Sequence, residues 1–121
     1  MVPASLGLVL DCADPDRLAE FWSAALGYTT LGGAGSYVLL APAGDGGPPP
    51  LLLQRVPEPR LGKNRMHVDL HTPDIEAEAD RLVDIGATRL AAEPLAEHGN
   101  HWILMADPEG NEFCVCDGGC T

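Results

Sequence analysis

The stretch LGLVLDCADPDRLAEFWSAALG at residues 6–27 has a counterpart in MHVDLHTPDIEAEADRLVDIG at residues 66–86. Each stretch reads as a short strand, a turn containing Pro and Asp, an amphipathic helix and a closing glycine. The helix-capping residues Asp14 and Asp74 lie 60 positions apart, which is the spacing of the repeat. A tandem repeat in a chain of 121 residues predicts two similar half-modules packed as one domain.

Each half continues the same plan, with three further strands after its helix. In the first half the strands and helix are expected at residues 5–11, 15–26, 28–31, 36–41 and 51–56. In the second half they are expected at residues 65–71, 74–85, 87–92, 101–106 and 112–117. Because one helix covers one face of each sheet, the two free faces can curve around a shared cleft. We therefore predict an α+β fold in which two tandem βαβββ modules, at about 5–56 and 65–117, form a curved mixed sheet around a cleft in a single domain, 1–121.

Composition excludes some classes of partner. The net charge of −11 argues against nucleic acid, because phosphate binding needs clustered Lys and Arg. The four cysteines show no paired framework spacing, and the chain contains neither a signal-peptide pattern nor an 18-residue apolar run. We therefore expect a cytoplasmic protein that neither needs disulfides nor binds a membrane.

The few basic residues are concentrated in one segment. Arg55, Arg60, Lys63 and Arg65 fall within eleven residues, near the junction of the two halves. A solvated linker is the interpretation we favour for this segment. The alternative is a local positive patch beside a pocket, able to attract an anionic group.

The alternation of side chains along two strands predicts which residues line a pocket. In the strand that opens the second half, Val68 and Leu70 share one face, and the opposite face carries the polar side chains. In the last strand the apolar Phe113 and Val115 should face the helix, leaving Glu and Cys on the cleft side. A solvent-facing sheet would show the same alternation, so the pattern alone does not establish chemistry. The predicted pocket residues are Gln54, His67, Asp69, His71, Glu112 and Cys114.

Two further motifs complete a family resemblance. The segments FWSAALGY at 21–28 and DPEGNEF at 107–113, together with the repeat, resemble the vicinal oxygen chelate superfamily. That superfamily includes glyoxalase I, extradiol dioxygenases, fosfomycin-resistance enzymes and the bleomycin-resistance proteins. The resemblance covers essentially the whole chain, and it implies the paired βαβββ fold. The closest match is to small glyoxalase-like proteins.

The resemblance also implies where metal ligands would lie. The ligand that opens the second half falls on His67, but its first-half counterpart falls on Gly7 or Leu8, neither of which offers a donor side chain. The final-strand Glu of the family falls on Cys114, with Glu112 two residues early. The remaining ligand falls near Gln54 or Leu52. A metal set of His67, Gln54 and Cys114 is therefore doubtful, and the usual Mn, Ni or Fe chemistry is disfavoured.

Two classes of function remain open. One is a protein of the glyoxalase and bleomycin-resistance type that binds a small organic molecule without the full metal site of the family. The other is a metal-dependent lyase, isomerase or dioxygenase. We favour the binding class and leave open whether the protein is an enzyme. We expect no cofactor, with a divalent metal as the alternative, a small-molecule ligand as the partner, and a homodimer because open sheets leave edges to cover.

Overall fold

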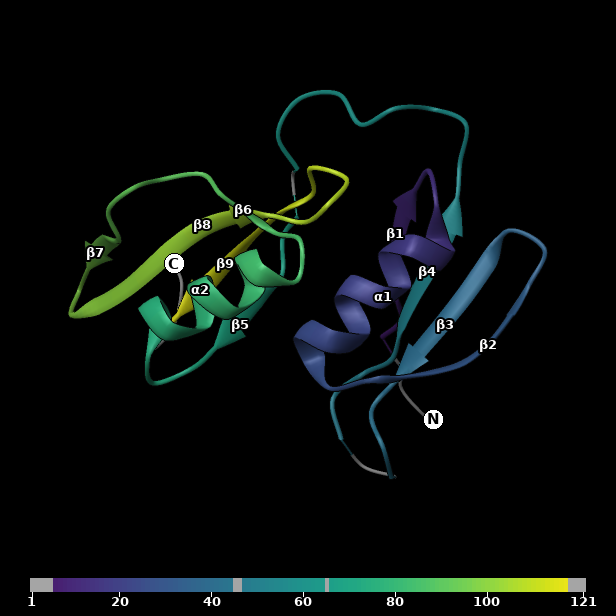
Figure 1. The fold of residues 1–121 in the computed structure, drawn as a ribbon, viewed down its shortest axis with the longest axis horizontal. Coiled ribbons are helices and arrows are strands. Elements are labelled where there is room, and N and C mark those ends of the chain that lie inside the picture. The colour runs from purple at the N-terminus through teal and green to yellow at the C-terminus, as the bar shows by residue number, and fades with distance from the viewer. Residues whose placement is uncertain (1–5, 45–46, 65, 118–121) are drawn as a thin grey trace, which may run out of the picture. The chain divides into compact units, whose positions relative to one another are not determined.

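The computed structural model describes residues 6–44, 47–64 and 66–117, and the chain divides into two compact units, Met1–Pro59 and Arg60–Thr121. Each unit contains one copy of the repeat, with one long helix and one sheet (Figure 1). The predicted α+β class and the tandem βαβββ plan are confirmed, and the mixed strands form two sheets, one in each unit. Ser5 and Arg65, where two predicted strands begin, lie outside the described residues.

The first unit is a four-stranded sheet with a helix on one face. Its sheet has the order β1-β4-β3-β2, in which β1 and β4 are parallel and the other pairs are antiparallel. The helix packs on the three strands that follow it in sequence. The elements are β1 (Leu8–Cys12), α1 (Pro15–Leu26), β2 (Thr29–Ala34), β3 (Tyr37–Ala41) and β4 (Leu51–Arg55).

Helix α1 begins and ends at the residues that the sequence predicts. The Asp14 carboxylate accepts a hydrogen bond from the backbone N–H of Arg17, and Pro15 occupies the first turn. Gly27 ends the helix with a φ of 70°, a left-handed conformation that glycine adopts without steric cost. The apolar face of α1 buries Leu18 and Trp22 against the sheet.

The second unit repeats this plan with one additional strand. The path β5-β9-β8-β6 forms the sheet, β7 pairs with β8, and β5 and β9 are parallel. Helix α2 packs on β6, β8 and β9, and Asp74 caps it by accepting from the Ala77 N–H. The elements are β5 (Asp69–His71), α2 (Ile75–Asp84), β6 (Thr88–Arg89), β7 (Leu95–Glu97), β8 (Asn100–Ala106) and β9 (Glu112–Cys116).

Three strands of the second unit differ from the prediction. Strand β5 is shorter than the predicted 65–71, and β6 is shorter than the predicted 87–92. Strand β7 was not predicted at all, because every residue in it is exposed and the segment lacks the apolar alternation of a half-buried strand. It pairs instead with β8 across the His98–Gly99 turn, where both residues have positive φ.

The core of the second unit lies between the sheet and α2. Ile103, Met105, Phe113 and Val115 are fully buried, as is Leu82 of the helix. Strand alternation therefore places Glu112, Cys114 and Cys116 on the sheet face away from α2.

The cysteines are in two states. In the described part of the chain, Cys12 and Cys114 are buried and form no disulfide. Cys116 is disulfide-bonded, which the cysteine spacing did not predict. No helix within the described residues is long and apolar enough to cross a membrane.

Candidate functional site

A tight turn before β9 fixes one wall of the site. Asp107 is 2% exposed, and its carboxylate accepts hydrogen bonds from the backbone N–H groups of Glu109 and Asn111, each at 2.9 Å. The side-chain amide of Asn111 donates to both Asp107 oxygens, at 3.2 and 2.9 Å. Gly110 completes the turn with a φ of 86°. These bonds satisfy the buried carboxylate within the turn and set the position at which Glu112 leaves it.

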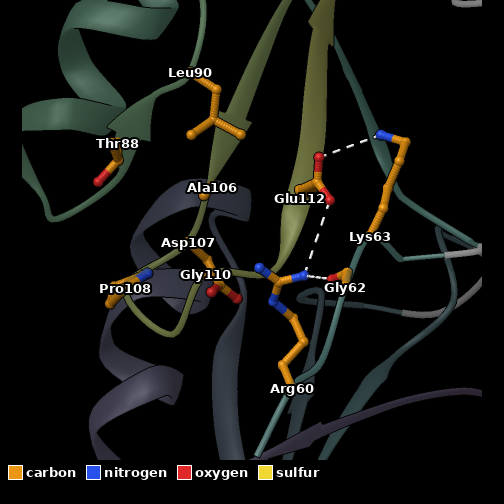
Figure 2. Close-up of a pocket in the computed structure, with 10 residues that line it drawn as sticks. All are labelled: Arg60, Gly62, Lys63, Thr88, Leu90, Ala106, Asp107, Pro108, Gly110 and Glu112. Carbon is orange, nitrogen blue, oxygen red and sulfur yellow. Dashed lines mark hydrogen bonds and ion pairs between the residues drawn. The ribbon is translucent and has the colours of Figure 1, made fainter.

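A pocket of about 580 Å³ opens beside this turn, entirely within the second unit (Figure 2). The connector before β5 supplies its basic side chains, and β6 and the segment after it supply Thr88 and Leu90. Leu90 is 47% exposed, so it offers apolar surface to the pocket. The residues that line the pocket are Arg60, Gly62, Lys63, Thr88, Leu90, Ala106, Asp107, Pro108, Gly110 and Glu112.

Two cations converge on one carboxylate in this pocket. Lys63 Nζ lies 3.2 Å from Glu112 Oε2, and Arg60 Nη1 lies 4.0 Å from Glu112 Oε1 (Figure 2). The Glu112 side chain is 14% exposed, whereas those of Arg60 and Lys63 are 37% and 68% exposed. The guanidinium of Arg60 also donates to the carbonyl of Gly62. The two cations exceed the charge of Glu112 by one, and the buried carboxylate of Asp107, which also lines the pocket, brings the formal charge of the lining to zero.

Arg60 packs against the glycine of this turn. A Cβ on Gly110 would lie 3.5 Å from Nε and 3.6 Å from Nη2 of Arg60, so the guanidinium packs directly over the backbone of the turn. The positive φ of Gly110 favours glycine there, whereas a Cβ would only be in ordinary van der Waals contact with Arg60. Arg60 is thus held by Glu112, by Gly62 and by the turn.

A second group of polar side chains lies on β5 and β9. His67 comes just before β5, Asp69 is the first residue of β5, and Cys114 pairs with Asp69 in the parallel register. One potential ligand atom from each residue lies within 4.8 Å of the other two. The side chains of His67 and Asp69 are 44% and 25% exposed, and Cys114 is buried. This group could hold a metal ion through nitrogen, oxygen and sulfur donors.

The thiol of this group is not activated for nucleophilic attack. Burial raises the pKa of Cys114, and the negative charge of Asp69 raises it further. Lys63 opposes these effects, and Glu112 adds to them. Burial and the neighbouring negative charges thus disfavour the thiolate that covalent catalysis by this cysteine would need.

The predicted pocket residues of the second unit fall in more than one place. Glu112 lines the pocket, while His67, Asp69 and Cys114 form their own group on the adjoining strands. His71 is exposed at the end of β5. The remaining predicted residue belongs to the first unit, where the Gln54 amide donates to the Tyr37 hydroxyl at 3.3 Å.

Sequence reasoning missed part of the pocket. We favoured a solvated linker for the segment that contains Arg60 and Lys63, and a linker predicts no pocket contact. Both residues line the pocket, as the alternative of a positive patch beside a pocket predicts. Thr88 and Leu90 were missed because neither belongs to a motif; an exposed leucine beside a strand is a weak signal. Arg55 lies elsewhere, bonded to the carbonyl of Ala13 in the first unit.

The first unit has a hollow of a different kind. Its open sheet face carries a depression of about 300 Å³ lined by Leu31, Gly32, Gly33, Ala34, Tyr37, Leu39 and Leu52. Among the described residues that line it, none carries a charge. Of these two hollows, the one in the second unit has charged side chains in its lining.

Comparison with known proteins agrees with this architecture. A family model described as a glyoxalase-like domain matches residues 7–116, and no curated protein matches the chain. A solved glyoxalase/bleomycin resistance protein/dioxygenase family enzyme from Burkholderia phytofirmans PsJN is similar, with a TM-score of 0.74 and 14% identity over 90% of this chain and 94% of that one. A glyoxalase-related enzyme from Fulvimarina pelagi has a TM-score of 0.67 and 17% identity, covering 98% of both chains.

A third similar structure contains ligands. The E126Q mutant of the fosfomycin resistance protein FosX from Listeria monocytogenes was solved with Mn(II) and 1S,2S-dihydroxypropylphosphonic acid. It has a TM-score of 0.77 and 13% identity, covering 98% of this chain and 93% of that one. At these identities the structures show a common fold, and the family match spans nearly the whole sequence. The chain therefore belongs to the glyoxalase-like domain family, within the vicinal oxygen chelate superfamily.

Proposed function

We propose that this protein binds a small organic molecule carrying an anionic group, in the pocket of the second unit. The observation that carries the proposal is the convergence of Arg60 and Lys63 on Glu112 at the wall of a pocket of about 580 Å³. Pockets of this size suit ligands of ordinary metabolite dimensions. A ligand carboxylate, phosphate or phosphonate would share the two cations with Glu112.

The other pocket residues suit the organic part of such a ligand. Leu90, Ala106 and Pro108 offer apolar contacts, and the Thr88 hydroxyl can donate or accept a hydrogen bond. The guanidinium of Arg60 can bind an oxyanion through two N–H groups, and Lys63 contributes a point charge. The similar FosX structure contains an organic phosphonic acid, so this fold accommodates an anion of the proposed class.

Binding without chemistry is the better-supported class because the hard-metal site of the family is not reproduced. Mn(II), which the FosX structure contains, prefers oxygen donors. At the position of the family carboxylate this chain has the thiol of Cys114, and Gly7 offers no side chain at the position of another ligand. The residues present do not fit that metal, and no catalytic step is assigned to it.

A metal-dependent lyase, isomerase or dioxygenase is the second candidate. The grouping of His67, Asp69 and Cys114 is the specific observation that favours it. This candidate requires metal-dependent conversion of the bound molecule, whereas the first requires only reversible binding.

Calorimetric titration tests the binding proposal with a matched pair of probes, phenylphosphonate and benzyl alcohol. The wild-type protein should bind phenylphosphonate more tightly than benzyl alcohol, since the two share a ring and differ in charge. Arg60→Gln and Lys63→Gln should each weaken phenylphosphonate binding by about fivefold, which corresponds to roughly 1 kcal/mol for a partly exposed charge. Arg81→Gln, on the exposed side of α2, is the control and should leave the affinity unchanged. Equal affinity for both probes, or unchanged affinity in both Arg60→Gln and Lys63→Gln, would refute the proposal.

A further inference from the structure

The pocket of the second unit offers a ligand both positive and negative groups. Arg60 and Lys63 supply two cations, and Glu112 supplies a carboxylate that pairs with both (Figure 2). Asp107 adds charge but no contact, because it is 2% exposed and its carboxylate accepts hydrogen bonds within the turn. With Asp107 counted, the formal charge of the lining is zero. A ligand whose own charges sum to zero would suit this lining.

The contacts of Glu112 leave one of its oxygens able to accept from a ligand. Within the described residues, the side chain accepts a hydrogen bond from Lys63, on Oε2 at 3.2 Å. Oε1 lies 4.0 Å from Nη1 of Arg60, which is beyond hydrogen-bond distance. Because an ionised carboxylate only accepts hydrogen bonds, an ammonium group is the ligand group that Oε1 would bind most strongly.

The two cations also keep donors for a ligand. In the described part of the chain, the guanidinium of Arg60 donates from Nη1 to the carbonyl of Gly62, and Nε and Nη2 donate to no acceptor. Lys63 is 68% exposed, and its ammonium group carries three donors, one of which Glu112 takes. A ligand carboxylate can therefore bind the cations beside Glu112.

We propose that the pocket selects a zwitterion, a free α-amino acid with an apolar side chain. Its carboxylate would bind Arg60 and Lys63, and its ammonium group would bind Glu112. An α-amino acid carries its two charges on neighbouring atoms of one centre, which matches a site whose opposite charges are 3.2 and 4.0 Å apart. The side chain would contact the apolar part of the lining, which includes Leu90 and Pro108. This inference rests on the proposed function, because it assumes that the pocket binds an anionic group.

The ammonium group offsets a cost that a simple anion incurs. A lone carboxylate competes with Glu112 for both cations and adds a second negative charge beside it. An amino acid brings a cation for Glu112, so each charge at the site has an opposite neighbour. For partly exposed pairs this difference corresponds to about fivefold in affinity.

Calorimetric titration with L-phenylalanine and 3-phenylpropionate tests the proposal, because the two probes differ in the α-ammonium group. Wild-type protein should bind phenylalanine about fivefold more tightly, as expected for one partly exposed ion pair. Equal or tighter binding of 3-phenylpropionate would overturn the selection of a zwitterion and leave the proposed anion binding intact. Failure of both probes and of phenylphosphonate to bind would refute the proposed function as well.

The variant Glu112→Gln tests the assigned ammonium contact. The ratio of phenylalanine affinity to 3-phenylpropionate affinity should fall about fivefold, because the ammonium group loses its charged partner. Removing a negative charge strengthens the binding of both carboxylates, and the ratio cancels that common gain. Glu78→Gln is the matched control, since it removes the same charge from α2, where Glu78 pairs with Arg81, and should leave the ratio unchanged.

An unchanged ratio in Glu112→Gln, or an equal fall in Glu78→Gln, would exclude Glu112 as the partner of the ammonium group. Circular dichroism verifies the fold of each variant. If Glu112→Gln fails to fold, the comparison of the two probes on wild-type protein still decides whether the pocket selects a zwitterion.

Discussion

Replacing Glu112 by glutamine should tighten anion binding, although Glu112 lies in the binding pocket. Its carboxylate is 3.2 Å from Lys63 Nζ and 4.0 Å from Arg60 Nη1, so it competes with an arriving anion for both cations. At these separations each charge pair is worth about 1 kcal/mol in bulk water. Because Lys63 is 68% exposed, solvent screening leaves a net gain of about 1 kcal/mol for the variant, or roughly fivefold tighter binding.

Calorimetric titration of Glu112→Gln with phenylphosphonate measures this change. The gain should shrink as salt rises from 0.01 to about 0.15 M, since the Debye length falls from about 30 to about 8 Å. Glu78→Gln removes the same charge from α2 and should leave the affinity unchanged. Weaker binding by Glu112→Gln would mean that the carboxylate is needed to hold the two cations in position, and the competition argument would then be wrong.

Two further predictions concern stability. Asp107→Ala leaves buried N–H groups of the turn without an acceptor and should lower the free energy of unfolding by about 3 kcal/mol. Urea denaturation in a Trp22→Phe background measures this loss, because the fluorescence of Trp102 then reports on the second unit. A loss below about 1 kcal/mol would contradict the role of Asp107 as the acceptor of the turn. Arg81→Gln should cost only about 0.3–0.5 kcal/mol at pH 7, as expected for an exposed helix pair. The hydrogen bond from Arg81 lowers the pKa of Glu78, so this contribution is present above the ordinary value of 4.5 and is lost as pH falls through the lowered value. A difference from wild type that persisted in acid would contradict that assignment.

Much of the fold could be predicted because the spacing of apolar residues along a helix or strand indicates which side chains are buried. The apolar face of α1 and the alternation of β9 are dictated by which side chains meet across the core, and both appear in the sequence as simple repeats. Strand β7 could not be found in this way, because its residues are exposed and its pairing with β8 depends on a turn. An exposed strand lacks the pattern that reveals a half-buried one.

The site residues on strands could be predicted from the sequence, and those in the connector could not. Strand alternation assigned Asp69 and Cys114 to one sheet face, and the structure pairs them in register. The contributions of Arg60 and Lys63 were less visible, since connector residues follow no period and their side chains reach Glu112 across 52 and 49 positions of sequence. Such contacts depend on where the turn before β9 places Glu112, which no local pattern encodes.

Backbone amide chemical shifts, followed during titration with phenylphosphonate, would show whether the second unit binds the ligand in the pocket beside the turn before β9. The largest changes in chemical shift should occur at residues that line this pocket, namely Gly62, Lys63, Leu90, Gly110 and Glu112. Shifts concentrated instead around the apolar hollow of the first unit, at Leu31 to Leu39, would contradict it.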